Sequence, residues 1–279
     1  MAVFYNQATL SYNNTTVSSN IVTGTIVDVL SASKTAVSEE YSAGEVLTYA
    51  VSLVNSGTAP LTGITVTDDL GAYTFGAGTL VPLTYKTGSV KYFLDGVLQP
   101  APTVTAGDTL VIGGITVPAE GNAMIIYQAS ANEYAPAASG SAITNTATVS
   151  GQGVTDITVS ATVPTADEAV LSVSKSLSPD EVSANGQLTY TFVIQNTGNT
   201  AETGAVLRDT FDPILNDITV TADGTVLTAA DYTYDETTGE FATAEGAFTV
   251  PAATFTQDTA KGTYTITPGM TVLTVTGTI

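Results

Sequence analysis

One stretch of this sequence occurs twice, 141 positions apart, and this repeat constrains the fold more than any other feature. The first copy, SASKTAV...GEVLTYAVSLVNSGTAPLTGITVTDDL, starts at Ser31, and the second, SVSKSLS...NGQLTYTFVIQNTGNTAETGAVLRDTF, starts at Ser172. The same spacing separates five pairs of identical residues: Lys34 and Lys175, Tyr49 and Tyr190, Asn55 and Asn196, Gly57 and Gly198, and Asp68 and Asp209. Self-similarity over this length indicates two homologous domains in tandem.

Both copies have the pattern of β-strands. Short segments rich in Val, Ile, Thr and Tyr alternate with period two and are separated by Gly, Asn, Asp and Pro. Helical periodicity is hard to find in any window. We therefore expect an all-β protein made of two tandem Ig-like antiparallel β-sandwich domains.

The two copies differ at their ends. The first continues through NEYAPAASGSAITNTATVSG into a further strand around residues 143–149, and the second stops before the equivalent strand. A matching segment stands near the N-terminus, where FYNQATLSYNNTTVSSNIVTG from Phe4 resembles ITNTATVSGQGVTDITVSA from Ile143. The match pairs Asn6 with Asn145 and Ala8 with Ala147. We predict a donor strand arm (residues 1–25), a complete sandwich (26–163) and a sandwich that lacks its last strand (164–279).

This layout predicts self-assembly. A sandwich without its last strand exposes an apolar slot and an unpaired edge, which can accept a strand from another chain. Phe4, Ala8 and Leu10 would fill that slot in a neighbouring copy. Closure within one chain stays open as an alternative, although the arm would then have to span the first domain. Head-to-tail contacts that do not close give an open filament, so the expected partner is a second copy of the chain.

Polar residues of three kinds, Lys, Asp and Asn, fall on the inward face of the expected strands. Alternation places Lys34 among Leu30, Ala32 and Ala36, and it places Lys175 among Leu171, Val173 and Leu177. The same alternation turns four more side chains inward: Asp68 and Asp209, and Asn145 and Asn6. The expected groups are Lys34, Asp68 and Asn145 in one domain, and Lys175, Asp209 and Asn6 across two copies.

Buried groups of this kind must neutralise one another or react. Burial lowers a lysine pKa and raises an aspartate pKa, so a neutral amine could attack the asparagine amide and release ammonia, with the aspartate relaying protons. The alternative is a buried ion pair beside an asparagine that makes hydrogen bonds. Asp69 and Asp212 could replace the named aspartates if a bulge shifts the register.

Composition excludes most other functions. The chain has no Cys and no His, which removes the usual transition-metal ligands and the usual base for a nucleophile. Its net charge of −20 disfavours binding to nucleic acid or an anionic membrane surface. The acidic loops lack the spacing of a calcium site. We expect no cofactor, no metal and no enzyme activity beyond a single self-directed reaction, and we see no classical signal peptide.

The inward Lys, Asp and Asn resemble the intramolecular isopeptide sites of Gram-positive pilin and adhesin domains. That resemblance implies a bond between Lys34 and Asn145 assisted by Asp68, and one between Lys175 and Asn6 of the next subunit assisted by Asp209. The motifs SKS...GQLTYTFVIQNTGN...VLRDTF and ITNTATVSG resemble the bacterial surface repeat called domain of unknown function 11.

The short two-repeat layout is more similar still to the spore appendage proteins of spore-forming anaerobes, which build ribbons or filaments. This resemblance implies an extracellular appendage, on the spore surface, made without a classical signal peptide. The sequence does not identify an anchor or a tip protein. A monomeric adhesin or ligand-binding surface module is the alternative function.

Overall fold

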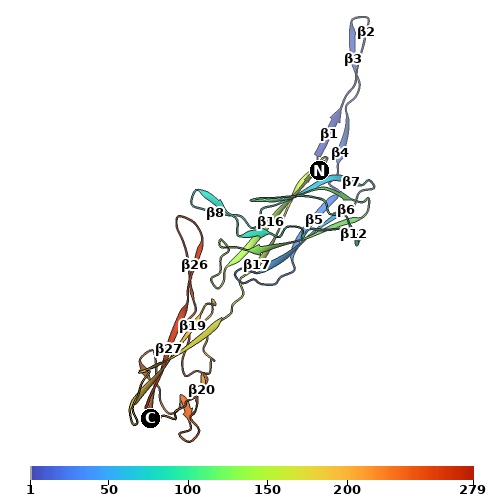
Figure 1. Cartoon of the computed structure of the whole chain (residues 1–279). Coiled ribbons are helices and arrows are strands. Elements are labelled where there is room, and N and C mark those ends of the chain that lie inside the picture. Colours follow the sequence, from blue (N-terminus) through green and yellow to red (C-terminus); the bar gives the residue numbers. More distant parts are fainter. Residues whose placement is uncertain (1) are drawn as a thin grey trace. The chain divides into compact units, whose positions relative to one another are not determined.

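A computed structural model describes residues 2–279, with the side chains at positions 2, 25 and 26 outside the description. Every regular element among the described residues is a β-strand, and every strand pairing given below is antiparallel. The chain divides into two compact units, the first holding residues up to Asn132 together with Ile143–Val163, and the second holding Glu133–Ala142 and Pro164–Ile279. Among residues 2–279 no helix is long and apolar enough to cross a membrane. The all-β prediction is confirmed (Figure 1).

Domain 1 is a sandwich of two sheets. The strand order of the first sheet is β12 (Val97–Gln99), β11 (Lys91–Leu94), β15 (Asn122–Ala131), β6 (Val46–Asn55) and β5 (Leu30–Ala36), with β10 (Leu83–Tyr85) also paired to β15. The order of the second is β13 (Thr103–Ala106), β14 (Leu110–Val117), β7 (Leu61–Asp68), β16 (Ala142–Gly151) and β17 (Val154–Pro164). A separate hairpin joins β8 (Tyr73–Phe75) and β9 (Gly78–Leu80).

The core of domain 1 follows the period-two alternation of the sequence. Strands β6, β15 and β16 bury every second residue, as expected where one face of a strand packs on the opposite sheet. The inward residues of β16 are Ile143, Asn145, Ala147 and Val149. Strand β16 therefore closes the core of the complete domain.

Domain 2 has one full sheet and one short sheet. The full sheet has the order β18 (Leu171–Ser178), β19 (Gln187–Asn196), β27 (Gly269–Thr278), β21 (Asn216–Ala222) and β22 (Thr225–Val226). The short sheet has the order β20 (Arg208–Thr210), β24 (Glu240–Thr243) and β23 (Tyr232–Tyr234). A hairpin of β25 (Thr254–Gln257) and β26 (Tyr264–Thr267) completes the unit. The core lies between the two sheets and includes Phe192, Phe211 and Phe241.

The repeat in the sequence corresponds to a repeat of hydrogen bonds. In domain 1 the Asn55 amide donates to Ala59 O at 2.8 Å, and the Asn55 side-chain oxygen accepts from Gly57 N at 2.9 Å. In domain 2 the Asn196 amide donates to the Thr200 carbonyl at 2.7 Å and its oxygen accepts from a glycine amide at 2.9 Å. Both asparagines are buried, and each fixes the same turn.

The strand deficiency of domain 2 is larger than one strand. In domain 1, β7 lies between β14 and β16, and β17 follows at the edge. The counterpart of β7 is β20, which pairs with β24 on one side and ends the sheet on the other. Among the described residues domain 2 therefore has no counterpart of β16 or of β17. All eight residues of β18 are exposed, the inward ones for the same reason, whereas its counterpart β5 buries Leu30 and Lys34.

The N-terminal arm is a hairpin, which corrects our expectation of a single strand. Strand β1 (Ala2–Asn6) pairs with β4 (Val22–Ile26), and β2 (Thr9–Tyr12) pairs with β3 (Thr15–Ser18). The chain reverses at Asn13 and Asn14, whose φ angles are 43° and 56°. Two residues in the left-handed region are what a type I′ hairpin turn requires, and asparagine tolerates that region better than most residues. Every residue from Val3 to Thr23 is exposed.

Candidate functional site

The first candidate site lies in the core of domain 1, on three strands of both sheets. Alternation turns Lys34 inward from β5, Asp68 inward from the end of β7 and Asn145 inward from β16. All three residues are buried. Lys34 and Asp68 lie in contact as the sequence pattern predicts, and the reaction expected of them with Asn145 stays a prediction.

Lys34 and Asp68 form a buried ion pair. Lys34 Nζ lies 2.5 Å from Asp68 Oδ2, and both side chains are 0% exposed. The second carboxylate oxygen accepts the Leu70 backbone N–H at 3.0 Å, and the ammonium lies 5.0 Å from the ring centroid of Tyr49. Burial lowers the pKa of Lys34 below its usual 10.5, and the charge and hydrogen bond of Asp68 oppose this shift. The neutral amine that a nucleophilic reaction needs is therefore more accessible here than at the surface.

Tyr127 joins the aspartate to the asparagine. Its hydroxyl donates to Asp68 Oδ2 at 2.5 Å, and Asn145 Nδ2 donates to the same hydroxyl at 3.0 Å. Burial, reinforced by the Asp68 charge, raises the pKa of Tyr127 well above its usual value, so the hydroxyl stays a donor. Sequence reasoning missed this residue, although its inward position between Ile125 and Ala129 follows from the alternation of β15.

Asn145 is only half satisfied. Its nitrogen donates to the Tyr127 hydroxyl, whereas its buried oxygen Oδ1 has no hydrogen-bond partner among the described residues. A buried acceptor without a donor costs about 1–3 kcal/mol. Lys34 therefore donates a hydrogen bond to Asp68, and Asn145 donates one to Tyr127. Among the described residues there is no hydrogen bond directly between Lys34 and Asn145.

The two alternative aspartates occupy different places. Asp69 accepts the backbone N–H groups of Gly71 at 2.8 Å and of Thr146 at 2.9 Å, so it fastens β16 to the end of β7. Asp212 is exposed. The carboxylates in contact with the two lysines are those of Asp68 and Asp209.

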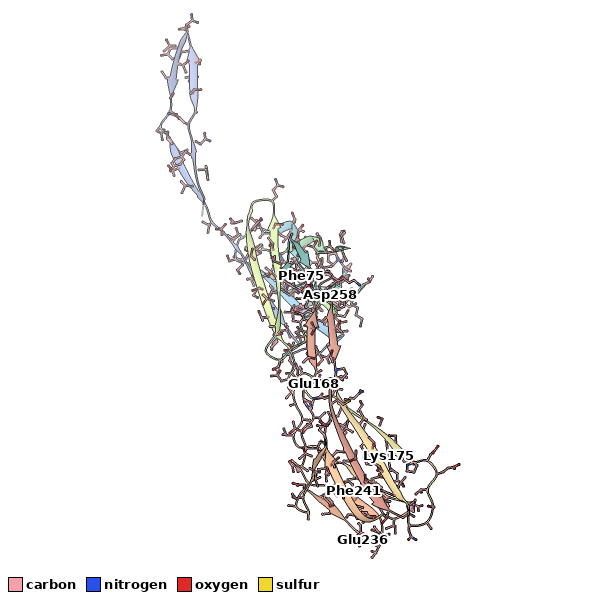
Figure 2. The ribbon with its side chains drawn as sticks, turned by 90° about the vertical axis from the view of Figure 1, so that its left-hand side faces the viewer. Phe75, Glu168, Lys175, Glu236, Phe241 and Asp258 are labelled. Atoms are coloured by element: carbon pink, nitrogen blue, oxygen red, sulfur yellow. The ribbon has the colours of Figure 1, made fainter. Side chains whose placement is uncertain are left out.

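The second candidate site repeats the pair in an open form. Lys175 on β18 forms an ion pair with Asp209 on β20, but their side chains are 40% and 18% exposed. The Lys175 ammonium lies 4.4 Å from the ring centroid of Tyr190, and Figure 2 labels Lys175 in domain 2. In domain 1 Tyr127 lies opposite Tyr49 in the sheet, and at the equivalent place in domain 2 Val275 lies opposite Tyr190. This site therefore has the lysine and the aspartate but neither the bridging tyrosine nor an asparagine from its own domain.

Asn6, the third member predicted for this site, lies on β1, where it is exposed and pairs in register with Val22. The prediction that it joins Lys175 and Asp209 concerns a neighbouring copy and stays a prediction.

An apolar groove lies beside the open site. It has a volume of about 160 Å³ and runs between β18 and the segment that precedes β20. Its lining residues are Leu171, Ser172, Val173, Ile194, Ala205, Val206, Leu207 and Phe248. Residues 206–209 are equivalent to residues 65–68 of domain 1, which pair with residues 147–150 of β16. The groove therefore lies where the counterpart of β16 would pack.

Among residues 2–279 no group of three or more acidic side chains is arranged to hold a metal ion.

Comparisons with known proteins find similar solved structures but no family. No family model matches the sequence, and no curated protein matches it. The major pilin subunit BcpA of Bacillus cereus is 14% identical, over 96% of this chain and 73% of that one, with a TM-score of 0.37. The C-terminal fragment of the major pilin of Streptococcus agalactiae is 14% identical, over 81% of this chain and 79% of that one, with a TM-score of 0.36.

The N-terminal domain of an adhesin of Streptococcus gordonii is also similar to part of this chain. It is 14% identical over 50% of this chain, which spans only 32% of that one, and the TM-score is 0.33.

Proposed function

We propose that this chain is a structural subunit that polymerises head to tail, by donating its N-terminal arm to domain 2 of the next copy. The observation that supports this most is the mismatch between the two ends of the fold. Domain 2 has an open edge at β20 and an apolar groove beside it. The arm carries the residues equivalent to those that fill this place in domain 1, and all of them are exposed.

The inward residues of β16 define what the arm must bury. Ile143, Ala147 and Val149 are buried in domain 1, and their equivalents in the arm are Phe4, Ala8 and Leu10. Phe4 is 52% exposed and Leu10 is 65% exposed. Full burial of a side chain of this size contributes roughly 1.5–3 kcal/mol, and the β20 edge would add backbone hydrogen bonds. Donation therefore removes two exposed apolar surfaces at once.

One arm and one groove per chain give a directional polymer. Each copy donates once and accepts once, so the contact is heterologous and an open filament is the expected product. A chain that closed on itself would satisfy the same groove but would stay monomeric at every concentration. We place the filament outside the cell, and the resemblance to spore appendage proteins favours the spore surface.

We further propose that amide bonds lock both sites. In domain 1, Nζ of neutral Lys34 attacks Cγ of Asn145, so a Nζ–Cγ bond forms and the Cγ–Nδ2 bond breaks. The proton lost by the amine passes through Asp68 to the leaving nitrogen, which departs as ammonia. The burial of Lys34 and its contact with Asp68 support this step. Lys175 would react in the same way with Asn6 of the next copy, assisted by Asp209.

Removal of the arm tests the proposed polymer. Residues 3–23 are exposed, so deletion of residues 1–26 takes no side chain that the structure places in a core. We expect negative-stain electron micrographs to show filaments of the full chain and none of the deletion variant, while circular dichroism shows the same β-structure in both. Unchanged filaments would refute the proposal. A full chain that stays monomeric in light scattering at high concentration would also refute it, and would leave closure within one chain and the ligand-binding surface module as the alternatives.

A further inference from the structure

We propose that the donated element is the whole N-terminal hairpin, residues 2–26, and that it supplies both missing strands of domain 2 in a second copy. This inference rests on the head-to-tail assembly proposed above and names what is exchanged. A single donated strand would replace only the counterpart of β16. The hairpin would replace the counterparts of β16 and β17 together.

The turn of the arm matches the turn between β16 and β17. Strand β16 ends at Gly151 and β17 begins at Val154, so two residues form the turn. Strand β2 ends at Tyr12 and β3 begins at Thr15, so two residues again form the turn. The offset that aligns Asn6 with Asn145 also aligns the two turns without a gap.

The pairing between the two strands also matches. In domain 1 the hydroxyls of Thr144 and Thr162 lie 2.9 Å apart, which identifies these residues as neighbours across β16 and β17. The same offset carries them to Tyr5 and Thr23, which are register partners in β1 and β4. The arm therefore has the register of β16–β17 at its base as well as at its turn.

In one cross-strand pair the arm has a larger residue on one strand and a glycine on the other, compared with the pair in domain 1. The offset carries Ile143 and Val163, both buried in domain 1, to Phe4 and Gly24. Phe4 and Gly24 are register partners, and a Cβ on Gly24 would lie only 2.3 Å from Phe4 Cζ. The phenylalanine ring thus covers the place of the missing side chain. This compensation involves both strands, so it is expected if both enter one core.

Donation of the intact hairpin breaks no pairing. The arm already holds five register pairs between β1 and β4 and four between β2 and β3. Donation of one strand would have to separate them before new hydrogen bonds form. A two-stranded hairpin is at best marginally stable in water, and it becomes stable when it joins a larger sheet with an apolar face. The combined sheet would have five strands, as the sheet of β13, β14, β7, β16 and β17 does.

The pairing of β16 with β7 fixes the register expected between two copies. Ala147 is opposite Asp68 and Val149 is opposite Val66. Transferred to domain 2, Ala8 of one copy lies opposite Asp209 of the next, and Leu10 lies opposite Leu207. Asn6 then follows on the inward face, on the side of Lys175.

A disulfide that locks the hairpin separates the two modes of donation. The chain has no cysteine, so the variant Tyr5→Cys/Thr23→Cys carries only the engineered pair. Their equivalents Thr144 and Thr162 are both exposed, so the lock lies on the outer face of the arm. We expect the oxidised and reduced variants to yield the same amount of pelleted filament, within about twofold. Filaments that form only after reduction would overturn hairpin donation and leave head-to-tail assembly standing.

A peptide of residues 2–26 provides the second measurement. Added to the full chain it should cap growing ends and shorten filaments, whereas a peptide of residues 2–12 should be at least tenfold weaker. Equal potency of the two peptides, or no capping by the longer one, would overturn the inference even if the cysteine variant fails to assemble. If the full chain does not polymerise, the proposed function fails. Binding of fluorescent peptide 2–26 then tests the hairpin alone, and no binding would refute it.

Discussion

Leu10 and Val149 occupy equivalent places in two copies of the same strand, yet one should control assembly and the other folding. Leu10 is exposed in the single chain and Val149 is fully buried in domain 1. Leu10→Ala removes three carbons from the donated face, and at about 0.8 kcal/mol per buried CH₂ each contact weakens by about 2.4 kcal/mol. The critical concentration for assembly should therefore rise about 50-fold.

The matched variant Val149→Ala should act on the fold. Its loss of two buried carbons and the cavity that remains should lower the melting temperature of the chain. Leu10→Ala should leave that temperature nearly unchanged, since exposed substitutions alter stability by about 0.5 kcal/mol or less.

The assay is sedimentation of filaments across a concentration series, combined with thermal melts of the soluble chain. A Lys175→Arg background keeps the cation and removes the primary amine, so the contact stays reversible and a critical concentration can be measured. An unchanged critical concentration for Leu10→Ala, or a melting temperature lowered as much as by Val149→Ala, would refute donation of this strand.

Four further predictions concern the lysine sites. The intact mass of the wild-type monomer should be lower by one ammonia than the mass of Asn145→Ala, once the substitution itself is corrected for, and an unshifted mass contradicts the bond in domain 1. Lys175→Ala should convert a boiling-resistant ladder on a denaturing gel into single subunits, and a persistent ladder contradicts the bond between subunits. Tyr127→Phe removes the hydroxyl that Asp68 and Asn145 share, and it should lower the free energy of unfolding of the wild-type chain by roughly 1–3 kcal/mol. In an Asn145→Ala background the same substitution should lower it by less, because one of the two hydrogen bonds is already absent. Chemical denaturation measures both differences. The pKa of Lys34 is lowered in the folded state, so the unfolded chain binds more protons than the folded chain between that pKa and 10.5. The free energy of unfolding of Asn145→Ala should therefore rise as the pH approaches 10.5. The same rise with pH in a Lys34→Met variant would contradict an origin in Lys34.

Alternation alone predicted that Lys34, Asp68 and Asn145 face the core of domain 1. It placed Lys34 and Asp68 inward, and the structure brings them into contact, because period two leaves a strand residue only two faces. Alternation could not rank partners within the core. Tyr127 was missed for that reason, since contacts between sheets depend on how strands from distant parts of the sequence are arranged.

The arm and the second domain were predicted in outline and differ in detail. Two adjacent asparagines, Asn13 and Asn14, form the hairpin turn, and this pair is a weaker turn signal than Asn-Gly. We expected one strand from the match to the segment at Ile143, and the structure has a hairpin. The sequence pattern also did not predict that β20 is short. The residues before Arg208 keep an alternating pattern, but they have no neighbouring strand to pair with.

Cross-linking between two copies tests the central claim most directly. Thr148 is opposite Thr67 in domain 1, so Thr9 of one copy should lie opposite Arg208 of the next. Directly opposed residues have Cα atoms roughly 4.5–5.5 Å apart, which a disulfide can bridge. Equal amounts of Thr9→Cys and Arg208→Cys chains should give a mixed disulfide dimer on oxidation, identified by peptide mass. A Thr16→Cys chain, one strand further away, should give none. The absence of the Thr9 to Arg208 disulfide in filaments, or an equal yield from the Thr16 control, would contradict arm donation.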